Sequence, residues 1–148
     1  MSISNKTIEE IADQLDCGMK CYLNISSGEI ITVVDDENFI DMETDAEIDE
    51  IKENRSAYLE FHMMTSHESF NVMMDFAMEI SDNQFQTRLL TALNAPSPFR
   101  NFKLKLDSSE SYRQKWFGYK KNRYIEYVKL QIHDGLIGQE ACQEGQGC

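Results

Sequence analysis

One stretch decides the fold: Cys21-Tyr22-Leu23-Asn24-Ile25-Ser26-Ser27-Gly28-Glu29-Ile30-Ile31-Thr32-Val33-Val34. It holds two short runs of β-branched, aromatic and aliphatic residues, 21–25 and 29–34, on either side of two serines and a glycine. Glycine adopts a positive φ without steric cost, and tight hairpin turns require that conformation. The stretch therefore predicts a β-hairpin with Gly28 in its turn.

Helix and strand signals surround this hairpin. Residues 58–63 alternate enough to predict a third strand. Capping boxes, in which a Ser or Thr precedes a Glu or Gln by three residues, predict helix starts at 7–10, 44–47, 65–68 and 81–84. Ser97-Pro98 predicts a further N-cap and first helical residue, and residues 107–110 start a last helix that ends at Gly135.

Because the strands come first and the helices last, the order predicts an α+β domain. We expect a small three-stranded, mostly antiparallel sheet, made of the N-terminal hairpin plus one strand, packed with a helical C-terminal half. A single domain is expected over residues 1–138, followed by a flexible Gln/Gly/Cys tail at 139–148. Four aromatic residues are expected to link the two halves: Phe99, Phe102, Trp116 and Phe117. Of these, Phe102 and Trp116 are expected to be largely buried.

Composition restricts the function classes. The 148 residues are 41% hydrophobic, enough for a core, and the formal charge of -12 disfavours non-specific binding to nucleic acid or anionic membranes. No apolar run is long enough for a membrane span and no signal pattern opens the chain, which predicts a cytoplasmic protein. We therefore expect Cys17 and Cys21 to be reduced and partly buried, while Cys142 and Cys148 fall in the tail.

Catalytic motifs are not found. The sequence has no G-x-S-x-G, no G-x-G-x-x-G and no G-x-x-x-x-G-K-[ST], so neither catalytic residues nor a cofactor are predicted. The acidic run 35–45 resembles a calcium loop, but its sixth position is Asp41 rather than glycine, which favours a solvated loop. His62 and His67, with Glu60 and Glu68 nearby, leave open a metal site or a surface and capping role.

Charge asymmetry is the most informative feature. Residues 1–95 hold 20 acidic and 5 basic side chains, whereas residues 96–148 hold 6 acidic and 9 basic ones, interleaved with aromatics. The aromatics are either core, with the cations paired to the acidic N-terminal half, or part of a surface for a partner. The candidate partner-binding residues are Arg100, Lys103, Tyr119, Lys120, Lys121 and Arg123.

A family resemblance is carried by the segment Pro98-Phe99-Arg100-Asn101-Phe102-Lys103, followed by Trp116-Phe117-Gly118-Tyr119-Lys120 and Arg123-Tyr124. It resembles the bacterial Uncharacterised Protein Family one-five-eight, whose members show an F-R-x-F-K core, a Trp-aromatic pair and an Arg-rich final helix. The hairpin is similar to the opening of that family. The resemblance implies a bacterial intracellular protein with the domain order above, and it brings no catalytic residues.

Three functions remain open. The first is a non-catalytic interaction or regulatory module with a protein partner. The second is a nucleic-acid-binding protein that uses the same basic and aromatic residues. The third is an enzyme or metal protein centred on His62 and His67.

Overall fold

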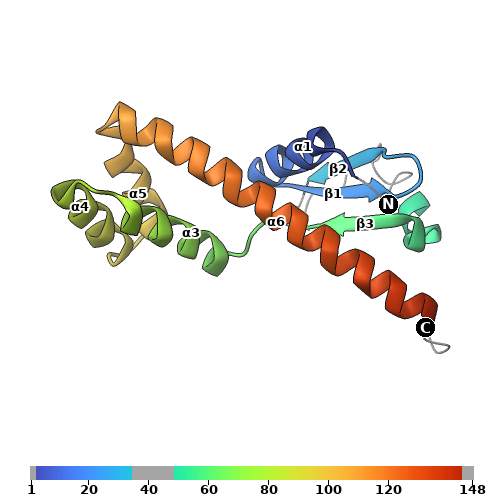
Figure 1. Ribbon diagram of the computed structural model, residues 1–148. Helices are drawn as coiled ribbons and strands as arrows, with labels where there is room; N and C mark the ends of the chain where they lie inside the picture. The colour runs from blue at the N-terminus through green and yellow to red at the C-terminus, as the bar shows by residue number, and fades with distance from the viewer. Residues whose placement is uncertain (1–2, 35–48, 145–148) are drawn as a thin grey trace. The chain divides into compact units, whose positions relative to one another are not determined.

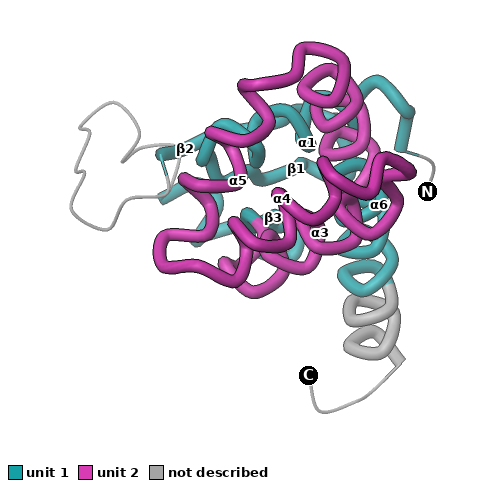
Figure 2. The backbone as a smooth tube through the Cα atoms, turned by 90° about the vertical axis from the view of Figure 1, so that its left-hand side faces the viewer, with its two compact units in different colours: residues 1–63, 124–148 teal, residues 64–123 magenta. Residues whose placement is uncertain are grey.

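The computed structural model describes residues 3–34 and 49–144, and the side chains as far as residue 136. The residues group into two compact units, coloured separately in Figure 2. Unit 1 comprises residues 1–63 and 124–148, and unit 2 comprises residues 64–123. The long helix α6 (Glu110–Glu144) contributes residues to both units. The expectation of one domain over 1–138 stays a prediction.

The predicted hairpin forms the greater part of a sheet in unit 1. Strand β1 (Met19–Asn24) pairs antiparallel with β2 (Ile30–Val34) and with β3 (Tyr58–Phe61), giving the order β2-β1-β3. Gly28 has a φ of 76°, and the Asn24 side chain accepts hydrogen bonds from the backbone of both turn serines. This sheet and the helices that follow it (Figure 1) confirm the α+β class.

Helix α1 (Asn5–Asp16) contacts β1. Its N-cap is Ser4, whose hydroxyl accepts the Thr7 N–H at 3.2 Å, so the predicted capping box starting at Thr7 is wrong. Ser4 offers a capping hydroxyl one turn earlier, and the helix gains that turn. As predicted, the helix stops before Gly18, whose φ is 88°. The buried positions match the predicted spacing and are Ile8, Ile11, Ala12 and Leu15.

A small apolar cluster in unit 1 involves residues 49–53, which are helical. Ile51 packs with Ile31, Val33 and Tyr58, so its predicted inward orientation is confirmed. A 3₁₀ turn (Arg55–Ala57) then leads into β3. The predicted helix start at 44–47, Ile48 and the acidic run 35–45 lie outside the described residues.

The C-terminal part of α6 packs on β3. The Gln131 amide both donates to and accepts from the backbone of His62, each at 3.2 Å. At Gly135, a Cβ atom would lie 2.8 Å from Cδ2 of Leu59, so a glycine allows the helix and strand to approach. The helix continues through Gly135 to Glu144, and the predicted end at Gly135 is therefore wrong. The glycine permits close packing rather than ending the helix.

A charged network lies across β1 and β3. Glu60 Oε1 pairs with Lys20 Nζ, accepts from Tyr22 at 3.4 Å and lies 3.6 Å from His62 Nε2. Partial burial alone would raise the pKa of Glu60, but the hydrogen bond and charge of Lys20 outweigh it and lower the pKa. Burial alone would lower the pKa of Lys20, yet the bonds to Glu60 and Tyr22 leave it raised.

This network predicts a pH-dependent contribution to stability. The pKa of Glu60 is lower in the folded state than in the unfolded state, where it is about 4.3. The stability that Glu60 contributes is therefore fully present above the unfolded-state pKa and is lost as pH falls through the folded-state pKa. Glu60→Gln should therefore cost about 1 kcal/mol at pH 7. Urea melts from pH 7 to pH 3 should show this difference from wild type shrinking; a difference that stays constant over the range contradicts it.

Unit 2 is helical. It contains α3 (Ser66–Glu79), α4 (Asn83–Leu93), α5 (Pro98–Asp107) and α6 as far as Arg123, and α4 contacts both α3 and α5. The capping box at Thr65 and Glu68 is present as predicted. Helix α4 is capped by Asp82, one residue after the predicted Ser81. Ser97 precedes α5 with a φ of 57° and makes no side-chain cap bond.

The core of unit 2 centres on aromatic rings. Phe102 is 0% and Trp116 is 6% exposed, which confirms their predicted burial. Their centroids lie 5.0 Å apart, and Phe76 packs edge-on against Trp116 at 5.2 Å. Phe99 and Phe117 are 36% and 49% exposed and lie outside the buried core, and their predicted role in linking the two halves stays a prediction. Phe117 follows Trp116 directly and is turned about 100° round the helix, away from the core.

No helix within residues 3–34 and 49–144 has an apolar stretch that would cross a lipid bilayer.

Candidate partner-binding site

The six predicted residues all lie in unit 2, but the structure divides them. Lys103 on α5 and Lys120 on α6 line one groove. Arg123 and Tyr119 are joined by a hydrogen bond of 2.9 Å on another part of α6. The remaining two, Arg100 and Lys121, are exposed and line neither this groove nor the second hollow described below.

The groove, here called the α5–α6 groove, has a volume of about 250 Å³. Residues from the second half of α5 and from α6 form it. Its lining residues are Lys103, Leu106, Asp107, Arg113, Trp116, Phe117 and Lys120.

The base of the groove is rigid because it belongs to the core. Leu106 and Trp116 are 2% and 6% exposed, and Trp116 is held between Phe76 and Phe102. On α6, the spacing of Arg113, Trp116 and Lys120 at i, i+3 and i+7 brings them to one face. Cations are therefore held beside apolar surface.

Arg113 is a third cation in the groove and was not among the six predicted residues. Its guanidinium lies 5.4 Å from the centroid of the Phe117 ring, a cation–π arrangement. Its ion pairs with Asp107 and Glu110 are long, 3.6 Å each, and all three side chains are well exposed. Exposed pairs of this kind contribute little to stability, so a ligand carboxylate can replace them. The i,i+4 spacing of Arg113 and Phe117 was the available sequence signal.

Arg123 is already engaged within unit 2. Its Nη1 donates to Asp75 Oδ2 at 2.8 Å and to the Tyr119 hydroxyl at 2.9 Å. The hydrogen bond to Asp75 raises the pKa of Arg123, against a smaller opposing effect of burial. For this residue the interpretation as an internal partner of the acidic N-terminal half is confirmed, since Asp75 belongs to residues 1–95.

The two histidines of the proposed metal site have separate neighbours. His62 lies 3.6 Å from Glu60, and His67 Nε2 lies 3.4 Å from the Asn71 amide nitrogen. Among the described residues no group of three or more His, Cys, Asp or Glu side chains gathers as metal ligands would. A metal site centred on these histidines has no geometric support in that part of the chain.

The cysteines in the described part of the chain are free thiols. Cys21 is buried as expected, and burial, with a smaller effect of Glu10, raises its pKa to about 11. It is therefore a thiol rather than a reactive thiolate at neutral pH. Cys17 is exposed, contrary to expectation. Cys142 and Cys148 lie beyond the residues whose side chains are described.

Comparison with known proteins gives a family. The sequence model of the Uncharacterised protein family (UPF0158) matches residues 1–135, which include both strands of the hairpin and every groove residue. The chain belongs to the UPF0158 family. A UPF0158 protein of Pseudomonas aeruginosa is 28% identical over 138 residues, covering 92% of this chain and 86% of the relative. No solved structure matches.

The predicted resemblance is thus confirmed. UPF0158 membership supplies neither an activity nor a set of functional residues, because the family is itself described as uncharacterised. The functional proposal for this UPF0158 chain therefore rests on the geometry of its own side chains.

Proposed function

We propose that this protein is a non-catalytic interaction module whose α5–α6 groove binds an acidic segment of a protein partner. One observation carries the proposal: three cations, Lys103, Arg113 and Lys120, line a groove of about 250 Å³ together with the half-exposed ring of Phe117. The cations would pair with carboxylates, and Phe117 would pack against an apolar side chain of the partner. Arginine and aromatic residues are enriched at the centres of protein interfaces.

Charge supports an acidic partner. Unit 2 holds nine Lys and Arg against six Asp and Glu, a formal charge of +3, within a chain of net charge -12. A local basic surface on an acidic protein attracts acidic segments while the rest of the molecule repels them, which favours binding at this one place. Arg100 and Lys121, which do not line the groove, are left out of the proposed site.

The same features favour protein over nucleic acid. A groove of this size takes one or two side chains, whereas a nucleic-acid backbone needs basic contacts along several phosphates. The proposal includes the cytoplasm as the compartment, which the sequence predicts.

Fluorescence anisotropy with a labelled acidic peptide tests the proposal. A suitable probe has the sequence of residues 35–48 of this chain, which carries seven Asp and Glu around Phe39 and Ile40. Its control has every Asp and Glu replaced by Asn and Gln. We expect saturable binding of the acidic peptide, at least about tenfold weaker binding of the control, and weaker binding at higher salt.

A single-stranded oligo(dT) of equal charge distinguishes the two classes of partner. If the oligonucleotide binds more tightly than the peptide, with a steep salt dependence, the nucleic-acid function replaces the one proposed. If the acidic and neutral peptides bind equally, or neither binds at low salt, the groove does not recognise acidic segments and the proposal is wrong.

A further inference from the structure

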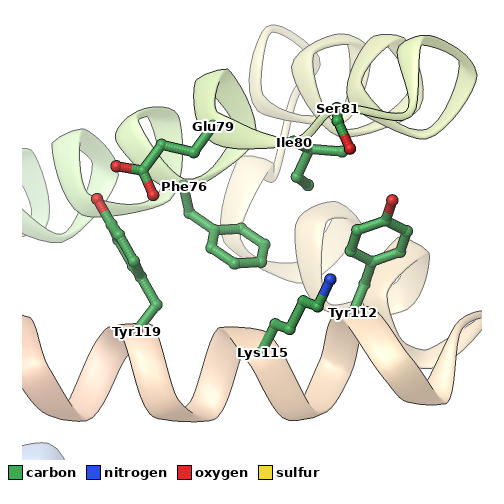
Figure 3. A pocket seen from close by; sticks show the side chains of 7 residues that line it. All are labelled: Phe76, Glu79, Ile80, Ser81, Tyr112, Lys115 and Tyr119. Atoms are coloured by element: carbon green, nitrogen blue, oxygen red, sulfur yellow. The ribbon is translucent and has the colours of Figure 1, made fainter.

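A second hollow, of about 220 Å³, lies in unit 2 between the C-terminal end of α3 and α6 (Figure 3). Phe76 and Glu79 come from α3, Ser81 follows that helix, and Tyr112, Lys115 and Tyr119 come from α6. The hollow shares no lining residue with the α5–α6 groove. The two sites can therefore be tested independently.

The floor and walls of this hollow are aromatic and fixed in place. Phe76 is 5% exposed, and Figure 3 shows its ring between the side chains of Tyr119 and Lys115. The ring of Tyr112 is stacked on Phe85 with centroids 4.4 Å apart and an angle of 9°. A ligand with an apolar body would thus meet rings that do not need to be ordered on binding.

Tyr119 forms the side of the hollow opposite Tyr112 and is held in place by its neighbours. Its ring lies 5.4 Å from that of Phe76, and its hydroxyl accepts a hydrogen bond from Arg123 at 2.9 Å. Asp75 holds Arg123 in turn at 2.8 Å. The Tyr119 oxygen acts as acceptor in this bond, so its own hydrogen remains available to a ligand or to a neighbouring carboxylate.

Two opposite charges stand at separate places on the rim. In Figure 3 the Glu79 carboxylate points to the Tyr119 side and the Lys115 ammonium to the Tyr112 side, where it lies 5.3 Å from the ring centroid. Among the described residues, neither Glu79 nor Lys115 forms a salt bridge. Glu79 is also the last residue of α3, where the helix dipole adds partial negative charge.

We propose that this hollow binds a small zwitterion of the α-amino-acid type with an aromatic or aliphatic side chain. The ligand ammonium pairs with Glu79 at the end of α3. Because an α-amino acid carries both charges on one carbon, the exposed and flexible Lys115 side chain must turn toward Glu79 to pair with the ligand carboxylate. The ligand side chain lies between the half-buried rings of Tyr112 and Tyr119, over Phe76. A ligand with both charges forms two ion pairs at the rim and a ligand with one charge forms a single pair, so the hollow favours molecules that carry both.

Calorimetric titration of the full-length protein with three matched compounds tests this proposal. L-Phenylalanine carries both charges, N-acetyl-L-phenylalanine lacks the ammonium, and phenethylamine lacks the carboxylate. We expect saturable, millimolar binding of L-phenylalanine and at least about tenfold weaker binding of each of the others. Trp116, the single tryptophan, lies 5.2 Å from Phe76, so its fluorescence should change with the same saturation.

The variants that test the hollow replace exposed side chains, so the protein should still fold. Glu79→Gln and Lys115→Gln should each weaken L-phenylalanine binding about tenfold, and Glu79→Gln should remove the preference over the N-acetyl compound. The matched control is Lys121→Gln, an exposed lysine of the same helix outside the hollow, which should bind normally. No saturation by L-phenylalanine or L-leucine at millimolar concentrations, or equal binding of the three matched compounds, would overturn the proposal.

Discussion

Phe102→Ala is expected to lower the free energy of unfolding by about 3–5 kcal/mol. The ring is fully buried and packs edge-on against Trp116 and Phe76, at centroid distances of 5.0 and 6.4 Å. Truncation removes a large apolar surface and leaves a cavity that the surrounding helices can only partly fill. Urea melts followed by circular dichroism measure the loss.

The control for this prediction is on the same helix. Phe99 is 36% exposed, so Phe99→Ala should cost much less, about 1 kcal/mol. Trp116→Ala removes the neighbouring ring and should cost about as much as Phe102→Ala. Losses below about 1 kcal/mol at both Phe102 and Trp116 would mean that these rings do not form the core of unit 2.

Gly135→Leu is expected to lower the free energy of unfolding by about 2–3 kcal/mol, although leucine is the better helix former. Even a Cβ atom at this position would lie 2.8 Å from Cδ2 of Leu59, a side chain that is itself buried in β3. A leucine side chain would force the helix away from the strand, and the packing energy lost would exceed the gain in helix propensity. The same urea melts measure the change in the free energy of unfolding.

Gly118 provides the matched control, because it lies in the same helix and a Cβ atom at this position would have no neighbouring atom within 4 Å. Gly118→Leu should raise the free energy of unfolding by up to about 1 kcal/mol, since only the helix propensity changes. If the two glycine substitutions shift stability in the same direction, close packing of α6 on β3 is not the reason for Gly135.

Local signals in the sequence were sufficient for most of the fold. The hairpin around Gly28 and the capping box at Thr65 depend on residues within one turn or one helix end, and both are present. The end of α6 was mispredicted because the role of Gly135 depends on Leu59, which lies 76 positions earlier in the sequence. Such a contact has no local signature.

The candidate site was predictable only in part. Charge counts pointed to α5 and α6 and included Lys103 and Lys120. They could not separate the cations that line the groove from Arg123, which pairs with Asp75. The roles of Arg113 and Phe117 depend on how α5 packs beside α6. Likewise, the second hollow requires the end of α3 to meet α6, and no spacing within either helix indicates this.

A comparison of two charge-matched double variants tests the central claim most directly. Lys103→Glu/Lys120→Glu changes the groove, whereas Arg100→Glu/Lys121→Glu makes the same change in net charge at exposed positions outside it. Both are titrated with the labelled acidic peptide at physiological salt after thermal melts have shown them folded. The groove variant should lose binding by at least about a hundredfold, and the other should remain within a fewfold of wild type. Equal losses in both would show that general charge, and not the α5–α6 groove, attracts the peptide.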